Sequence, residues 1–370
     1  MRRRGWGGRG ASAREPAARR LIRCVCATTI ALAVVGMLAF PLTAVAQEAR
    51  WEETAPAPGA FTQGESGYSP LLTLLNPTVG RARLGVADRV TWLPEEPVAG
   101  QPTHLDAVQQ EFSVAFPLWQ DRTHEWSAFA TVRSAFFHTQ AVLPDTRQTF
   151  PEALWQLRFG TVYRHQFANG WIGGGTLSVG SASDRPFASS RELLAGGSAF
   201  LRVPQGQRNA WLFSLAYSPT SELGIPLPGV AYVAQPSERL LAVIGLPLAL
   251  RYRPWATLSL EASYIPLRTV HARAISRLVA PLRLFASFDW RDESYFLADR
   301  LHTKDRFFSY DKRATAGMQL PLGRHGALEL AGGYVFDRFY FEGQGYSDRD
   351  HNRIDVGAGP VLSFQGQVRW

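Results

Sequence analysis

Cysteine is almost absent from this chain of 370 residues, because its two cysteines both lie within the first 46 residues. Residues 47–370 therefore cannot form disulfides or thiolate metal sites. They also contain no apolar run near the roughly 18 residues that a transmembrane helix requires. If this part of the chain spans a membrane, it must do so as a closed β-barrel, since only closure pairs all backbone groups of the strands within lipid.

Motifs for catalysis and cofactor binding are missing as well. The sequence has no G-x-S-x-G nucleophile motif, no H-x-x-x-H pair among its eight histidines and no P-loop. We therefore expect no catalytic residue, no metal ligand and no cofactor. On this basis the protein is interpreted as a non-enzyme.

The first 46 residues have the features of a targeting segment. A basic stretch precedes an apolar stretch (24–40) and the sequence Ala44-Val45-Ala46, which is an A-x-A cleavage site. We predict a signal peptide over 1–46, cleaved near Ala46; the alternative is an uncleaved membrane anchor. Eight arginines and one glutamate give this segment +7 of the net charge of +8, so residues 47–370 carry +1. At that charge a nucleic-acid partner is not expected.

The last eighteen residues alternate between apolar and small or polar side chains. One face of a strand would carry Ile354, Val356, Ala358, Pro360, Leu362, Phe364, Val368 and Trp370, and the other Arg353, Asp355, Gly357, Gly359, Ser363, Gln365, Gln367 and Arg369. Successive side chains of a strand point to opposite sides of its sheet. One apolar and one polar face are typical of a strand in an outer-membrane barrel.

Similar alternation recurs through residues 78–370. With residues 353–370 the segments number fourteen, and the others are 78–92, 107–118, 124–137, 153–167, 171–183, 194–203, 208–218, 240–252, 257–264, 268–279, 282–293, 313–322 and 328–336. Each is about long enough to cross a bilayer as a tilted strand. We therefore predict an all-β fold over 78–370, an antiparallel transmembrane outer-membrane β-barrel of about fourteen strands. Twelve is the fallback number, because some segments contain proline, which cannot donate to a strand ladder.

The connections between these segments alternate in length, with one exception at 266–267. Long connections are predicted at 93–106, 138–152, 184–193, 219–239, 297–311 and 343–352. Barrels of this class have short periplasmic turns and long external loops, and an even strand number places both ends of the barrel in the periplasm. Residues 47–77, with four prolines and three glycines, are expected to be an extended segment in the periplasm or in the barrel interior.

Tryptophans lie near the ends of the predicted strands, as expected for the aromatic girdles of a membrane barrel. A soluble β-sandwich is the alternative fold. The repeated polar and glycine-rich face argues against it, because the inner face of a sandwich is apolar.

The C-terminal half contains four distinctive short segments: 211–219 (WLFSLAYSP), 228–232 (PGVAY), 245–247 (GLP) and 332–343 (GGYVFDRFYFEG). These segments resemble a functionally uncharacterised family of bacterial outer-membrane β-barrel proteins. The resemblance implies a barrel in the outer membrane of a Gram-negative bacterium and brings no activity with it. The terminal strand also resembles the signal that outer-membrane proteins present to the barrel-assembly machinery, with Leu362, Phe364, Val368 and Trp370 at its apolar positions and Gly366 as a departure.

Charged residues on the predicted inward face are the candidates for a functional site. They are Glu261, Arg273, Arg277, Arg283, Asp289, Arg291, Glu293, Glu329, Asp337, Arg353 and Asp355, with His271 among them. One interpretation is a pore lining whose field acts on small polar solutes. The other is a set of paired ions that fill a closed interior, because buried charges require partners.

The function predicted from these features is a passive channel or binding barrel for small polar solutes. One alternative is a lipid-modifying enzyme, which would need a serine and a histidine on the lipid-facing rim; residues 165–170 (HQFANG) resemble such a site but contain no serine. The other alternative is a structural or adhesion barrel. The expected partners are outer-membrane lipid, the barrel-assembly machinery and a small solute.

Overall fold

The computed structural model describes residues 78–220, 224–265, 269–279 and 281–370. These belong to the second of two compact units, Thr54–Trp370. The signal peptide over 1–46 and the extended segment over 47–77 lie outside the described residues and stay predictions.

The described chain is built almost entirely of β-strands. They are β1 (Gly85–Pro97), β2 (His104–Gln120), β3 (His124–Thr139), β4 (Ala153–Gln166), β5 (Ile172–Ser183), β6 (Leu193–Gln205), β7 (Asn209–Tyr217), β8 (Leu227–Ser237), β9 (Leu240–Gly245), β10 (Leu248–Trp255), β11 (Leu258–Ile265), β12 (Thr269–Val279), β13 (Leu282–Tyr295), β14 (Arg306–Leu322), β15 (Gly326–Gly343), β16 (Arg353–Val356) and β17 (Gly359–Arg369). Two 3-10 turns, η1 (Ser190–Glu192) and η2 (Tyr346–Asp348), lie in connections. Among the described residues, none of the helices is long and apolar enough to cross a membrane.

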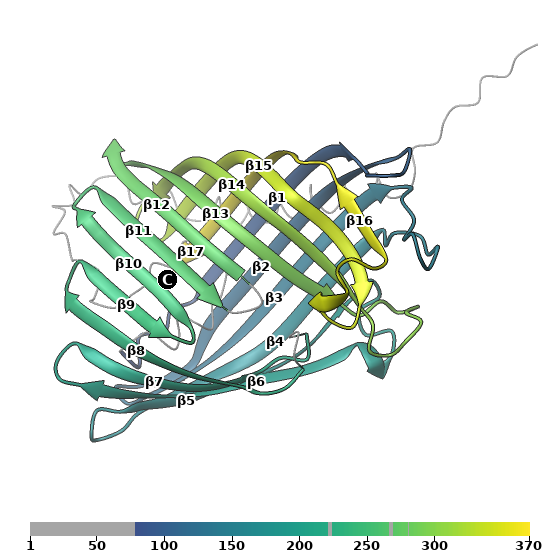
Figure 1. The fold of residues 1–370 in the computed structure, drawn as a ribbon. Helices are drawn as coiled ribbons and strands as arrows, with labels where there is room; N and C mark the ends of the chain where they lie inside the picture. Colours follow the sequence, from purple (N-terminus) through teal and green to yellow (C-terminus); the bar gives the residue numbers. More distant parts are fainter. Residues whose placement is uncertain (1–77, 221–223, 266–268, 280) are drawn as a thin grey trace, which may run out of the picture. The chain divides into compact units, whose positions relative to one another are not determined.

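Apart from β16 and β17, which do not pair with each other, consecutive strands pair antiparallel, and the sheet closes on itself (Figure 1). Closure joins β1 to β17, from Gly85 opposite Arg369 to Trp92 opposite Leu362. β16 and β17 both pair with β15 and together occupy one position. The all-β antiparallel barrel is confirmed, but it has sixteen strands, so both fourteen and the fallback of twelve are wrong.

The two additional strands come from the region around residue 240. β8 lies within the connection predicted over 219–239, where two prolines and a glycine at 228, 229 and 236 are typical of a loop. The segment predicted over 240–252 is a hairpin, β9 and β10, that turns at Leu246-Pro247. Gly245 precedes this turn with φ of 136°, a conformation that few other residues adopt.

The connections at one end of the barrel are all short. They are 121–123, 167–171, 206–208, 238–239, 256–257, 280–281 and 323–325, and β1 begins and β17 ends at this same end. We call it the short-turn end and the opposite one the long-loop end. The long-loop end carries the longest connection, 140–152, although 246–247 and 266–268 there are also short.

Large apolar side chains cover the outward face of the strands. Leu177, for example, is 70% exposed, and several exposed tryptophans border the short turns: Trp119, Trp126, Trp171, Trp211, Trp255 and Trp370. The alternation of strand side chains explains this, since the inward-facing neighbours of these residues are buried or polar.

Candidate functional site

The inward face is identified by side chains that contact each other across the barrel. Arg133 on β3 lies 3.5 Å from Glu293 on β13, and Arg313 on β14 donates a 2.7 Å hydrogen bond to Gln109 on β2. Neither pair belongs to neighbouring strands. These side chains therefore point into the interior, and strand alternation assigns the remaining residues to one face or the other.

A polar ladder crosses the seam where the barrel closes. Gln365 on β17 lies directly opposite Arg89 on β1, Arg89 opposite Glu111 on β2, and Glu111 opposite Arg133 on β3. Arg89 Nε donates to Gln365 Oε1 at 2.8 Å, and Arg133 Nη2 lies 2.8 Å from Glu111 Oε1. Directly opposed unlike charges stabilise the strand pairing that carries them.

The strands across the interior add further ion pairs at this level. Arg313 holds the carboxylate of Asp311 through both Nε and Nη2, at 2.7 and 2.6 Å. His271 Nδ1 lies 2.8 Å from Asp289 Oδ1. A cavity of about 30 Å³ remains beside Arg89, Glu111 and the neighbouring side chains, which is room for ordered water.

Arg273 illustrates how the sequence shapes the interior locally. Gly317 has no side chain, which leaves room for the ring of Phe285 on the adjacent strand. The guanidinium of Arg273 lies 3.9 Å from the centroid of that ring. From there its Nη2 reaches Glu329 Oε2 on β15 at 2.8 Å, and both side chains are buried.

Most of the charged residues predicted from the sequence lie on the inward face. These are Glu261, Arg273, Arg277, Arg283, Asp289, Arg291, Glu293 and Glu329, together with His271. Whether they line a passage stays a prediction.

Asp337 lies on the outward side, and its predicted inward position is wrong. Its φ is 50°, and the register between β14 and β15 shifts at this level. A register shift of this kind is a β-bulge, and its extra residue reverses which face the following residues of the strand point to. The Asp337 carboxylate consequently pairs with Lys312 Nζ at 2.7 Å, and Lys312 lies opposite the outward-facing Phe336.

The inward position predicted for Arg353 and Asp355 is also wrong. Ile354 and Val356 on β16 are the residues buried in the interior cluster, so their neighbours face outward. Arg353 Nε donates to Asp355 Oδ1 at 2.9 Å. Alternation across 353–370 is broken between β16 and β17, because Val356 is buried whereas Leu362 is exposed.

Several interior charges were not among the predicted site residues. They are Arg89, Glu111, Glu125, Arg133, Arg164, Asp311 and Arg313. The signal was weak in the first strands, because residues 89, 111 and 133 each have one apolar and one polar neighbour. Their mutual contact depends on strand register, which alternation does not specify.

A group of arginines lies on the inward face of β10, β12 and β13 toward the short-turn end. Arg251 pairs with Glu261 at 3.3 Å, and Arg283 Nη1 donates to Gln319 Oε1 at 3.4 Å. Arg277 interacts electrostatically with both Arg251 and Arg283, and Arg253 with Arg251. Among the described carboxylates, none lies within ion-pair distance of Arg253, Arg277 or Arg283. We call these three residues and Arg251 the basic cluster.

The interior at the long-loop end is apolar instead. The connection 140–152 bends inward, so that Leu143 and Phe150 are buried. The Phe150 ring meets those of Phe137, Phe307 and Tyr340 edge to face, with centroids 5.0–5.4 Å apart. Edge-to-face aromatic packing adds stability beyond the buried area. The connection therefore packs inside this end of the barrel, against β3, β14 and β15.

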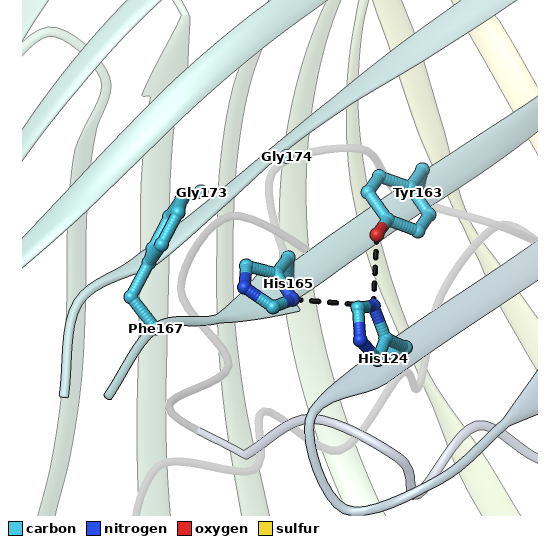
Figure 2. Close-up of a pocket in the computed structure, with 6 residues that line it drawn as sticks. All are labelled: His124, Tyr163, His165, Phe167, Gly173 and Gly174. Carbon is cyan, nitrogen blue, oxygen red and sulfur yellow. Dashed lines mark hydrogen bonds between the residues drawn. The ribbon is translucent and has the colours of Figure 1, made fainter. Parts of the chain in front are cut away.

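His165 lies outside the interior, on the outward face near a short turn. Its imidazole contacts the imidazole of His124 and the phenyl ring of Phe167, and His124 contacts Tyr163 (Figure 2). In the part of the chain that the structure describes, the side chains of the two histidines form hydrogen bonds with each other and with Tyr163, and no serine hydroxyl is among these partners. The described part of the chain contains no cluster of three or more histidine, cysteine, aspartate or glutamate side chains that could hold a metal ion.

Comparison with known proteins gives distant structural similarity. No family model matches the chain. No curated protein matches it either. One similar solved structure is an outer-membrane channel from Pseudomonas putida F1, with 8% identity and a TM-score of 0.34 over 80% of this chain and 98% of that one. A second is OccK7 from Pseudomonas aeruginosa, with 9% identity and a TM-score of 0.35 over 78% of this chain and 98% of that one. A third is the toluene transporter TodX from Pseudomonas putida, with 10% identity and a TM-score of 0.35 over 82% of this chain and 94% of that one. At these scores the similarity supports no functional argument, and the family resemblance of residues 211–343 stays a prediction.

Proposed function

We propose that this protein is an outer-membrane channel for small polar solutes, and that anions are its preferred solutes. The observation that carries the proposal is a barrel closed at sixteen strands whose interior is charged and rich in arginine. The width of a barrel grows with its strand number, and barrels of 16–18 strands leave an aqueous channel between their side chains.

The outward face supports a location in the outer membrane. Exposed leucine, phenylalanine and valine cover the strands, and exposed tryptophans border the short turns. An apolar band with an aromatic girdle matches a lipid bilayer and its interface. Export through a signal peptide cleaved near Ala46, and insertion by the barrel-assembly machinery through Phe364, Val368 and Trp370, complete this proposal.

The preference for anions follows from the basic cluster. Arg253, Arg277 and Arg283 face the interior without an ion-pair partner among the described carboxylates. Charged side chains that line a passage act on ions at short range, where water screens them least. An anionic solute entering from the short-turn end therefore meets attractive charge, whereas a cation is repelled.

Passage also requires the long-loop end to open. Residues 140–152 narrow it, because Leu143 and Phe150 are buried inside the barrel there. This connection is joined to the barrel wall by side-chain packing and by hydrogen bonds to another loop rather than by a continuous strand ladder. We infer that its displacement opens the channel.

Ion selectivity in planar bilayers tests the proposal. The full chain, folded in detergent and inserted into a bilayer under a KCl gradient, is expected to give conductance steps and a reversal potential toward that of chloride. The variant Arg253→Gln with Arg277→Gln should shift the reversal potential toward zero. Arg185→Gln is the matched control, since Arg185 is exposed at the long-loop end and pairs with Asp184. A complete lack of conductance would contradict the channel, and cation preference would contradict its selectivity.

A closed barrel with a structural role is the second candidate, because some interior charges pair across the barrel. Arg133–Glu293 and Arg313–Gln109 are such contacts. If they fill the interior, the variant Arg133→Ala should leave the membrane as impermeable as before. In a channel, the same change removes an obstruction and raises conductance.

A further inference from the structure

Two histidines lie side by side on the outward face, at the short-turn end of β3 and β4. His124 is directly opposite His165 in the strand register. Their ring centroids are 4.4 Å apart, and the two Nδ1 atoms are 3.2 Å apart. The hydroxyl oxygen of Tyr163 lies 2.8 Å from His124 Nδ1 (Figure 2). His124 Nδ1 therefore lies close to two other polar atoms, the Tyr163 oxygen and His165 Nδ1, both of which come from the adjacent strand β4.

Local structure fixes this arrangement. Tyr163 and His165 are two residues apart on β4, so their side chains share its outward face. On β3 the next outward residue after His124 is Trp126, which is exposed. The His124 ring also stacks on that of Trp119, with centroids 5.2 Å apart, which limits its rotation.

A hollow of about 350 Å³ opens beside the pair, lined by His124, Tyr163, His165, Phe167, Gly173 and Gly174. The outward position of β5 opposite His165 is Gly173, and a side chain there would approach the ring of Phe167, so the glycine keeps the hollow open. Phe167 forms one wall, its ring 4.5 Å from that of His165. The polar atoms of the pair thus border open space rather than packed side chains.

We propose that His124, His165 and Tyr163 form a binding site for a divalent transition-metal cation such as Cu²⁺ or Zn²⁺. Imidazole nitrogens bind these ions at about 2.0–2.1 Å. Two such ligands in a tetrahedral arrangement are then roughly 3.3 Å apart. The 3.2 Å between the two Nδ1 atoms matches that separation before any ion is present.

The remaining chemistry of the site is consistent with such an ion. The Tyr163 oxygen supplies a third donor, and the hollow leaves space for water or an exogenous ligand in a fourth position. A neutral imidazole that carries its proton on Nε2 presents an Nδ1 lone pair, so both rings can bind the ion through Nδ1 in their neutral form. Imidazole selects copper, zinc and nickel over magnesium and calcium, which prefer oxygen ligands.

This site is independent of the channel proposal, since it lies on the other face of the sheet. A bound ion would join the ends of β3 and β4 and stabilise the folded barrel by mass action. The site can therefore be present in a barrel that conducts nothing, and a conducting barrel can lack it.

Metal titration of the folded full chain, without an affinity tag, tests the proposal. Calorimetry with CuCl₂ or ZnCl₂ is expected to show one saturable site, and MgCl₂ none. His124→Gln or His165→Gln should weaken copper binding at least about tenfold. Tyr163→Phe should weaken it less. Electron paramagnetic resonance of the copper complex should show hyperfine coupling to two nitrogens.

His351→Gln is the matched control, because His351 is an exposed histidine at the long-loop end. It should leave copper affinity unchanged. Glutamine keeps a polar side chain of similar size, and electrophoresis without heating verifies that each variant is folded. Equal copper affinity in the wild type and in the His124→Gln, His165→Gln double variant would overturn the proposal, as would equal binding of magnesium.

Discussion

Asn352 and Asp145 hold each other through reciprocal hydrogen bonds, although 207 residues separate them. The Asn352 backbone N–H donates to Asp145 Oδ2 at 2.6 Å, and the Asp145 backbone N–H donates to Asn352 Oδ1 at 3.0 Å. The Asn352 amide also donates to Thr146 Oγ1 and to Glu342 Oε2. This contact joins the connection 140–152, which narrows the long-loop end, to the loop before β16.

Removing the side chain of Asn352 should therefore release this connection. Asn352 has φ of 45°, so Asn352→Gly keeps the backbone conformation while deleting the side-chain hydrogen bonds. Each bond lost contributes about 0.5–1.5 kcal/mol. We expect longer or more frequent openings in single-channel recordings.

Asp350→Ala is the control for that variant. Asp350 lies in the same loop, but its side chain is exposed and its ion pair with Arg353 spans 3.7 Å. The channel of the Asp350→Ala variant should open as rarely as that of the wild type. Identical recordings for Asn352→Gly and the wild type would show that the hydrogen bonds do not hold the channel closed.

Arg273→Met should destabilise the folded barrel by about 3–5 kcal/mol, because it leaves the buried carboxylate of Glu329 without its arginine. Methionine keeps the contact with the Phe285 ring and removes only the charge and its hydrogen bonds. Urea unfolding in detergent, followed by tryptophan fluorescence, measures the change.

The double variant Arg273→Met, Glu329→Met separates charge loss from lost packing. A buried ion pair replaced by apolar residues of similar volume is often close to neutral in stability. We expect the double variant to recover most of the stability that the single variant loses. A double variant as unstable as Arg273→Met alone would mean that lost packing, not the loss of the ion pair with Glu329, dominates.

Alternation predicted the strand class and most strand positions because outward apolar side chains recur at every second residue. It failed at β8, where Pro228 and Pro236 are tolerated at the ends of a short strand, and at the hairpin turn after Gly245. A two-residue turn leaves the apolar content of its flanking strands unbroken. A single long strand and a tight hairpin therefore have similar sequence patterns.

The interior charges were predictable only as far as alternation holds. Arg273 and Glu293 follow it, but Asp337 and Arg353 lie beyond irregularities that reverse the face. The apolar packing inside the long-loop end could not be predicted, because Phe150 reaches the interior from a connection rather than from a strand. Likewise, the contact between His124 and His165 requires the register of β3 and β4.

Asp121 should make the stability of the turn before β3 depend on pH. Its carboxylate accepts hydrogen bonds from the backbone N–H groups of Thr123 and His124, at 2.7 and 2.8 Å, and these lower its pKa below the ordinary value. A carboxyl whose folded-state pKa is lowered stabilises the fold above its unfolded-state pKa, and this contribution is lost as the pH falls through the folded-state pKa.

Asp121→Ala should consequently lower the midpoint temperature of unfolding equally at pH 7 and pH 6, where the carboxylate is ionised in both states. The difference from the wild type should shrink only below the usual aspartate pKa of about 3.9. Asp121→Asn, which keeps a side-chain oxygen acceptor for the turn, should lower the midpoint less, and its difference from the wild type should shrink over the same pH range. A difference that is constant from pH 7 to pH 3 would contradict a role for the ionised carboxylate.

Phe364 on the last strand should be needed for assembly in cells but not for the stability of the finished barrel. Its side chain is 48% exposed on the outward face, between Val90 on β1 and Leu330 on β15. Because it packs against few protein atoms, Phe364→Asn should change unfolding in detergent little. If the assembly machinery reads this strand, the same variant should strongly reduce the amount of protein in the outer membrane.

Leu330→Asn provides the matched comparison for Phe364→Asn. Leu330 lies directly opposite Phe364, is 53% exposed on the same face, and belongs to β15 rather than to the terminal strand. Both variants place one amide toward lipid at the same level, so they carry the same cost of insertion. Fractionated membranes should therefore contain much less of the Phe364 variant than of the Leu330 variant. If the membranes contain equally little of both variants, the cost of placing the amide in lipid, and not recognition of the terminal strand, limits assembly.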